Sequence, residues 1–210
     1  QVGSAYQQLD LLQKFMYKQN EFITHKLNLQ LSNSSNIDRY DRLTQMENGV
    51  AKYAEWYYGP QYRFLSSYTF EHSKSNQWYD NAKLIAAYQA ITESRMVRRF
   101  QDDQLKSRIE DLDIFTLNVD FFKDLIKRDK TVGNLMSKHE LNYGLDVSHN
   151  IVGSTAYSTK IYTLLNTALD TRYPDGGSDM SSFAIYCTDT WELNRKMIVN
   201  GGLRASHVRL

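Results

Sequence analysis

The chain has 210 residues, of which 41% are hydrophobic and 23% charged, so it can bury a core and is not expected to be disordered. Its 25 basic and 24 acidic residues leave a formal net charge of +1, which gives no general attraction to nucleic acid or to an anionic membrane. Cys187 is the single cysteine, so no intrachain disulfide can form, and no apolar run reaches the roughly 18 residues of a membrane-spanning helix.

The N-terminal third of the chain has apolar residues at helical spacing. In the first segment Ala5, Leu9, Leu12, Met16, Ile23 and Leu27 fit one helix face, and the polar stretch SNSSN follows. From about Ile37 a second seam consists of Leu43, Met46, Val50, Tyr53 and Tyr57. Two such segments joined by a short polar turn predict an antiparallel helical hairpin.

The stretch EWYYGPQYRF, residues 55–64, is dense in aromatic rings. Gly59 and Pro60 are the usual end of a helix, and an irregular or short-strand insert is expected near 59–76, with its strand mainly over 61–72. On a helix, consecutive rings point about 100° apart, so some must face solvent or a partner. The alternatives are a subunit contact, a seal over the helix end and a ligand pocket. The contact interpretation involves Trp56, Tyr57, Tyr58, Tyr62, Arg63 and Phe64.

The middle of the chain also predicts helices. Residues 77 to about 130 contain neither glycine nor proline, and apolar residues recur at helical steps with an interruption near Asp102. We therefore expect two helices that meet there, a short helix near 135–142 and another over 154–172. Arg95 and Arg99 would share a helix face, and with Lys106 they form a candidate basic face.

The last part of the chain differs in pattern. YPDGGSD is a turn signal, SFAIYCT at 182–188 favours a strand, and a capping box at Asp189 and Glu192 begins a final helix. The expected fold is mainly α: an elongated helical bundle over 1–172 with a small mixed α/β appendage over 173–210.

Catalytic and metal-binding patterns are not recognisable. Cys187 has no histidine at a typical spacing, and neither His139-Glu140 nor Glu71-His72 repeats as two ligands on one helix face would. No glycine-rich phosphate loop is present. The sequence therefore predicts no catalytic site, metal or cofactor.

The function that this fold would serve is that of a non-enzymatic structural or assembly subunit of a larger complex, such as a secretion or pilus-like machine or a virion connector. The alternatives are an enzyme with a dispersed site and a nucleic-acid-binding subunit that uses Arg95 and Arg99. Protein subunits in a homo- or hetero-oligomer are the expected partners, and nucleic acid is not favoured. The start at Gln1 is read as a processed or a trimmed N-terminus, and an exported, periplasmic or virion-associated setting is favoured over the cytoplasm.

Overall fold

A computed structural model describes residues 3, 5–128, 135–194 and 196–210; Gln1 and residues 129–130 of the expected middle helices lie outside these ranges. Strand accounts for 74% of the chain and helix for 4%. The predicted elongated helical bundle is therefore wrong. Among the described residues, no helix is long and apolar enough to cross a membrane.

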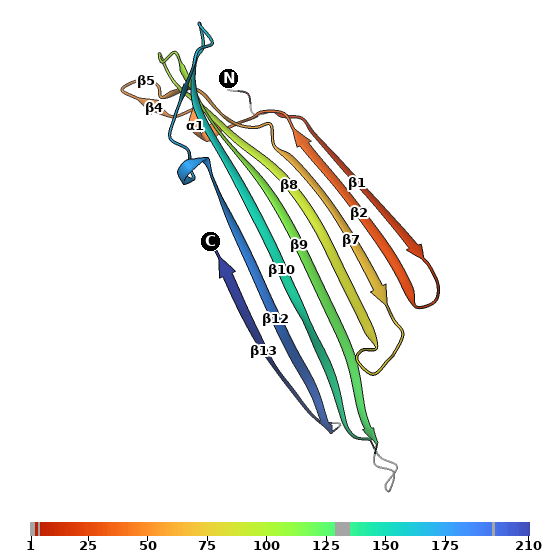
Figure 1. The fold of residues 1–210 in the computed structure, drawn as a ribbon. Helices are drawn as coiled ribbons and strands as arrows, with labels where there is room; N and C mark the ends of the chain where they lie inside the picture. Colours follow the sequence, from red (N-terminus) through yellow and green to blue (C-terminus); the bar gives the residue numbers. More distant parts are fainter. Residues whose placement is uncertain (1–2, 4, 129–134, 195) are drawn as a thin grey trace.

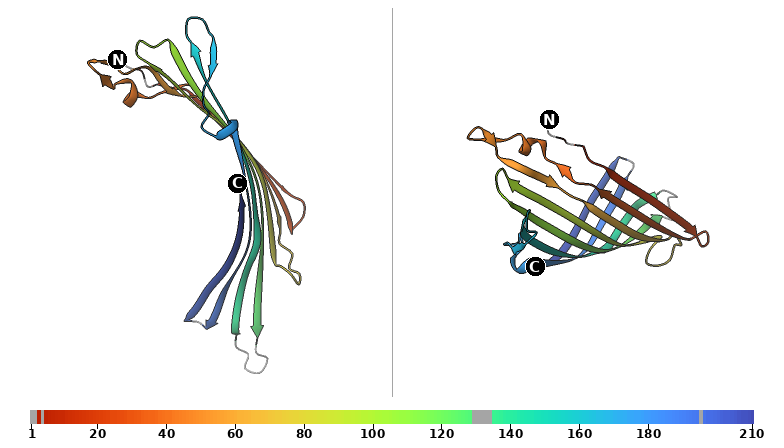
Figure 2. Two further views of the ribbon diagram at one scale, coloured as in Figure 1. Left: turned by 60° about the vertical axis from the view of Figure 1, so that its left-hand side comes forward. Right: turned by 90° about the horizontal axis from the view of Figure 1, so that it is seen from above.

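One large antiparallel sheet contains the long strands (Figure 1). In spatial order these are β1 (Gln8–Lys18), β2 (Ile23–Ser34), β7 (Tyr62–His72), β8 (Asn81–Arg99), β9 (Gln104–Arg128), β10 (Leu135–Lys160), β12 (Gly177–Asn194) and β13 (Met197–Arg209). The sheet is strongly twisted, and its strand ends are staggered (Figure 2). β12 and β13, which fall in the expected appendage of 173–210, are hydrogen-bonded to the sheet beside β10.

Short elements lie at the upper end of the sheet as drawn in Figure 1. Between β2 and β7 these are β3 (Ile37–Asp38), α1 (Tyr40–Leu43), β4 (Met46–Glu47), β5 (Val50–Ala51) and β6 (Tyr53–Tyr58). Between β10 and β12 they are β11 (Asn166–Ala168) and the 3-10 turn η1 (Pro174–Gly176). In place of the predicted N-terminal helical hairpin, the chain forms the β1–β2 hairpin and the short elements β3 to β6, among which α1 is the single helix.

The reason for the wrong assignment is visible in β9. Its predicted helical seam combined Phe115 and Val119 with Phe122, which lie on opposite faces of a strand. The same stretch also alternates: Phe115, Leu117, Val119 and Phe121 are separated by polar residues. The scarcity of proline does not distinguish the two folds, because a central strand excludes proline as a helix does.

The register gives the sheet two chemically different faces. Phe121 of β9 lies opposite Tyr143 of β10, which lies opposite Cys187 of β12; this side is called the apolar face. One position along, Asp120 lies opposite Gly144, which lies opposite Tyr186; this side is called the polar face. Because side chains alternate along each strand, each long strand contributes to both faces.

Gly59 and Pro60 join two strands and do not end a helix. β6 continues the line of β7 along β8, since Tyr58 pairs with Arg95 and Tyr62 with Thr92. Gly59 has φ +121, and a side chain there would approach the backbone oxygen of Ser35 to 2.9 Å, so the junction requires glycine. The stretches expected to contain strand, near 61–72 and at 182–188, do form strand in β7 and β12.

Gly144 makes room on the polar face for the ring of Tyr186. A Cβ at residue 144 would approach the Tyr186 hydroxyl oxygen to 2.7 Å and would also collide with the backbone oxygen of Val119. The Tyr186 hydroxyl donates a hydrogen bond to the Asp120 carboxylate across Gly144. Three neighbouring strands are therefore locked together at this point.

We expect Gly144→Ala to lower the free energy of unfolding by about 1–3 kcal/mol, the usual cost of overpacking. The measurement is the urea concentration at the midpoint of unfolding. Gly153→Ala on the same strand is the matched control, because its Cβ would meet nothing closer than the Asp111 oxygen at 4.0 Å. Equal midpoints for the two variants would contradict this account.

The connection 73–80 between β7 and β8 is held by the carboxylate of Asp80. That carboxylate accepts hydrogen bonds from the Ser75 hydroxyl at 2.5 Å, the Asp124 N–H at 2.7 Å and the Lys123 ammonium at 2.9 Å. The Ser75 and Asp124 hydrogen bonds, followed by Lys123, lower the pKa of Asp80 to about 2. The ionised form is therefore the one that holds the connection.

Because the folded pKa of Asp80 lies below its unfolded value of about 3.9, the carboxylate stabilises the fold above pH about 4, and this contribution disappears as the pH falls towards 2. We expect the protection factors for amide exchange in residues 73–80 to fall over that range, and Asp80→Asn to show low protection there already at neutral pH. Glu21→Gln, in the turn between β1 and β2 at the same end, is the control and is expected to leave the exchange in 73–80 unchanged. Unaltered exchange in Asp80→Asn would refute the proposed role.

Candidate functional site on the polar and apolar faces

Side-chain hydrogen bonds and ion pairs cross the strands on the polar face. Asp146 of β10 accepts a hydrogen bond from the Asn118 amide of β9 at 2.7 Å and another from the Arg204 guanidinium of β13 at 2.5 Å. On the same face, towards the β1 edge of the sheet, Lys26 of β2 and Glu71 of β7 form an ion pair at 2.7 Å. This face is therefore suited to contact water or a polar ligand and not to pack in a hydrophobic core.

A cavity of about 440 Å³ lies on the polar face near its upper end. Its lining residues from the central strands are Ile91 and Glu93 of β8, Glu110 and Leu112 of β9, and Asn150 and Val152 of β10. Arg172 and Tyr173, from the segment before η1, lie in another part of the wall. The remaining lining residues are Ser178, Asp179, Met180 and Leu210. This combination of apolar side chains with a few charged groups is typical of a small-molecule site.

The segment before η1 is fixed against β10 by two hydrogen bonds and stabilised by a third within the segment. The Leu169 N–H donates to the Ala156 oxygen at 3.0 Å, and the Arg172 N–H donates to the Ser154 hydroxyl at 3.3 Å. The Thr171 hydroxyl then donates to the Tyr173 oxygen at 2.6 Å. These bonds place Arg172 beside the strands that carry Glu93 and Glu110.

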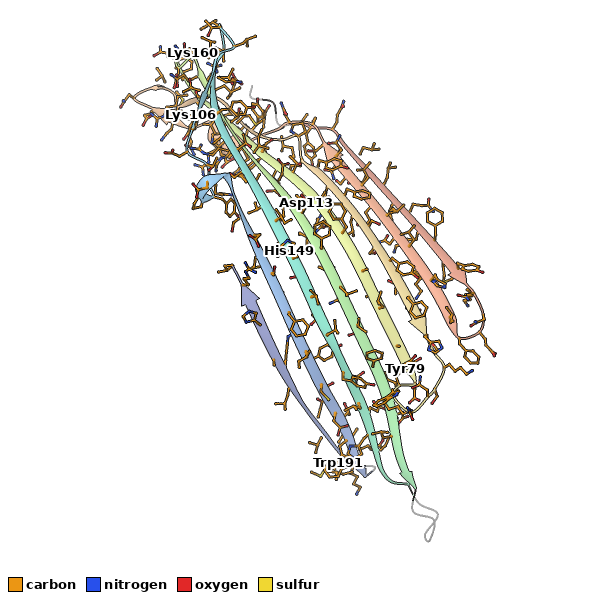
Figure 3. The ribbon with its side chains drawn as sticks, in the orientation of Figure 1. Tyr79, Lys106, Asp113, His149, Lys160 and Trp191 are labelled. Atoms are coloured by element: carbon orange, nitrogen blue, oxygen red, sulfur yellow. The ribbon has the colours of Figure 1, made fainter. Side chains whose placement is uncertain are left out.

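The apolar face presents aromatic rings in two groups. The lower group includes the pairs Tyr17–His25 at 5.9 Å between ring centroids, Tyr79–Phe121 at 5.4 Å, Phe121–Tyr143 at 5.2 Å and His139–Trp191 at 5.2 Å. The upper group includes Phe64–Tyr88 at 6.4 Å and Tyr88–Phe115 at 4.9 Å. Figure 3 shows Tyr79 and Trp191 in the lower part of the sheet and His149 nearer its upper end.

Between these groups the apolar face is open to its surroundings and free of charge. Leu117 and Val119 on β9 and Ile185 on β12 occupy positions between the rings, and Ile185 is 52% exposed. Apolar-face positions 62–72 of β7 and 139–151 of β10 include no Asp, Glu, Lys or Arg. A soluble protein rarely leaves so large an apolar surface uncovered.

Comparison with protein families explains the two faces. The family described as TonB dependent receptor-like, beta-barrel matches residues 7–210. The chain belongs to this family of TonB-dependent receptor-like β-barrels.

Among solved structures, one similar chain is described as the ferric citrate transporter FecA in its unliganded form, with a TM-score of 0.70 and 16% sequence identity. The match covers 98% of this chain and 30% of that chain, so the sequence spans about a third of the length of the transporter. At this identity the likeness concerns the fold alone. A comparison with curated protein sequences gives no significant match.

Membership of the β-barrel family corrects the functional predictions. An assembly subunit of a secretion or pilus-like machine or a virion, a helical enzyme and a nucleic-acid-binding subunit all presupposed the helical fold, which the family match and the strand content overturn. The alternation of the long strands was the signal that could have indicated a barrel.

The candidate contact residues of this β-barrel chain lie on both faces. Trp56 and Tyr58 of β6 share one side, where their rings meet edge to face at 4.9 Å, and Tyr57 occupies the other. Trp56 is only 8% exposed, because the Arg39 guanidinium lies over its ring at 5.3 Å. Trp56 thus helps to attach the α1 region to β6.

The Arg39 side chain is in turn held by Asp41. Its Nε and Nη2 atoms donate to the two carboxylate oxygens of Asp41 at 2.7 and 2.8 Å, which lowers the pKa of Asp41. Of the remaining candidates, Tyr62 and Phe64 lie on the apolar face and Arg63 on the polar face, where its Nε donates to Gln89 at 2.9 Å. A protein contact at residues 55–64 remains a prediction.

The candidate basic residues of the barrel chain lie on one face of the sheet, not on the helix face that their spacing predicted. Arg95 and Arg99 of β8 and Lys106 of β9 all lie on the polar face near the upper end. The strand register also places Arg108 directly opposite Arg95, and helical spacing did not identify it.

Cys187 lies on the apolar face and is exposed. His139 is adjacent to Asp189, with its Nδ1 atom 2.7 Å from a carboxylate oxygen. Within the described part of the barrel chain, no group of three or more His, Cys, Asp or Glu side chains could hold a metal ion.

Proposed function

We propose that the chain forms part of the wall of an outer-membrane receptor that admits a ligand into the cell envelope and draws energy from a TonB-type protein partner. The observation that carries this proposal is the two-faced sheet: an open apolar face that is free of charge between its two groups of aromatic rings, and a polar face with cross-strand ion pairs. Transmembrane barrels present this arrangement, with the apolar side towards lipid and the polar side towards the lumen.

The dimensions of the strands support a membrane-spanning wall. β9 has 25 residues and β10 has 26, whereas crossing a bilayer takes about 9–11 residues of a tilted strand. The two groups of rings then lie at the two lipid–water interfaces, where tyrosine and tryptophan are favoured. The remaining length projects beyond the membrane.

The connections between strands support one orientation. At the lower end the connections that the structure describes in full are residues 19–22 and 73–80, whereas at the upper end the long strands are connected by residues 35–61, 100–103 and 161–176, two of which are long. Outer-membrane barrels have short periplasmic turns and longer extracellular loops. The upper end, with the 440 Å³ cavity, is therefore the extracellular side in this proposal.

The predicted protein contact at residues 55–64, the predicted boundary at residue 172 and the location of the protein are proposals for the same receptor. Residues 55–64 lie at the extracellular end, where β6 and the α1 region would form a contact with another protein subunit. The boundary of two folding units at residue 172 is likewise a proposal. The location that we propose is the outer membrane.

The native Cys187 provides the test, because its thiol would face lipid while the adjacent Thr188 faces the lumen. The receptor is reconstituted in lipid bilayers and treated with a sulfonated, membrane-impermeant maleimide, and modification of the peptide containing residue 187 or 188 is quantified by mass spectrometry. We expect Cys187 to react at least about tenfold more slowly than the introduced thiol of the double variant Cys187→Ser, Thr188→Cys, since the reactive thiolate is disfavoured in lipid.

Solubilisation in detergent followed by denaturation is the control and should make both thiols react equally. Equal rates in the intact bilayer would mean that the two faces are assigned wrongly, and the proposed function would fall with them.

A further inference from the structure

Five basic side chains gather on the polar face near its upper end, and we name this set the rim cluster: Arg95 and Arg99 of β8, Lys106 and Arg108 of β9, and Lys160 of β10. Figure 3 shows Lys106 and Lys160 at this end of the sheet. The strands bring them together through register, since Arg95 lies opposite Arg108 and Lys160 lies opposite Gln104, two positions from Lys106.

The positive charges of the rim cluster are not paired with acidic side chains among the residues that the structure describes. Neighbouring basic residues at this end are paired: Arg98 with Glu55 at 2.6 Å, and Arg39 with Asp41 at 2.7 Å. In contrast, none of the five rim side chains makes an ion pair or a side-chain hydrogen bond to any other part of the chain that the structure describes.

The Arg95–Arg108 pair opposes folding. Like charges directly opposite each other on neighbouring strands destabilise a sheet, and here both guanidinium groups lack an acidic partner among the described residues. A group with two or more negative charges placed between them would relieve the repulsion and accept charge-assisted hydrogen bonds from both.

We propose that the rim cluster binds a small ligand that carries at least two carboxylate or phosphate groups, with Arg95 and Arg108 as the central pair. This inference rests on the proposed function, because the polar face must line the lumen of a receptor. A lumen-facing position also distinguishes this site from one for lipid headgroups, which would contact the opposite face.

The surroundings of the rim cluster define the size and character of the ligand. The adjacent row towards the middle of the sheet contains Glu93 opposite Glu110, and both line the 440 Å³ cavity. These carboxylates repel acidic groups and keep them at the rim. The cavity also contains Ile91 and Leu112, so the part of the ligand that enters it is uncharged and partly apolar.

The test is calorimetric titration of the detergent-purified receptor at low ionic strength with two probes, pyrophosphate and propane-1,2,3-tricarboxylate, and with neutral glycerol as a third titrant. We expect at least one acidic probe to bind, binding to weaken as salt is added, and the double variant Arg95→Gln, Arg108→Gln to bind at least about tenfold more weakly. Comparison of the two probes shows whether phosphate or carboxylate is preferred.

The matched control is the double variant Lys14→Gln, Lys18→Gln, which removes the same charge from the polar face of β1 towards the lower end of the sheet. It should bind the acidic probe as the native receptor does. The proposal is overturned if neither acidic probe binds, if glycerol binds equally well, or if both double variants lose affinity to the same extent.

The Cys187 measurement on the same preparation, reconstituted in lipid, separates the two proposals. If Cys187 is protected but neither acidic probe binds, the rim cluster is not an anion site and the membrane-wall proposal stands. If Cys187 reacts as fast as an introduced thiol at position 188, the polar face does not line a lumen and both proposals fail.

Discussion

Pairing of the backbone N–H and C=O groups between neighbouring strands is the constraint on which the rest of this structure depends. Backbone polar groups in a bilayer have no water to satisfy them, so a membrane wall built from strands must pair them strand to strand. That pairing fixes the register, and the register decides which side chains share a face. The joint placement of Asp120 with Tyr186, and of Arg95 with Arg108, follows from it.

The two faces then follow from alternation along each strand. On the apolar face, rings and aliphatic side chains contact their neighbours without forming a dry interior, and in a bilayer lipid would cover them. On the polar face, hydrogen bonds such as that between Asn118 and Asp146 join strands through their side chains. In the wall that we propose, the polar face lines the lumen, which reverses the pattern of a soluble core.

The sequence allowed only part of this to be predicted. Strand near 61–72 and at 182–188 could be recognised because alternation or β-branched and aromatic residues dominate those short stretches. In β8 and β9 the apolar residues are frequent enough to fit both periods, and Phe122 and Ile109 gave a helical seam that crosses from one face to the other. Arg95, Arg99 and Lys106 were grouped by helical spacing, whereas it is the strand register that places them on one face of the sheet, and Arg108 required the register between two strands. The cavity combines Glu93 with Arg172 from a distant connection, which no local pattern indicates.

The contact between Gly144 and Tyr186 also bears on how such long strands find one alignment. A slip of β12 by two residues against β10 would preserve both faces, so polarity alone does not distinguish the correct register from its neighbours. In either slipped arrangement the Tyr186 ring would lie opposite Asn142 or Asp146 and would meet a side chain where Gly144 offers none. Because glycine has no side chain, Gly144 selects a single register of β12 against β10 among several that would all keep apolar residues on one face and polar residues on the other.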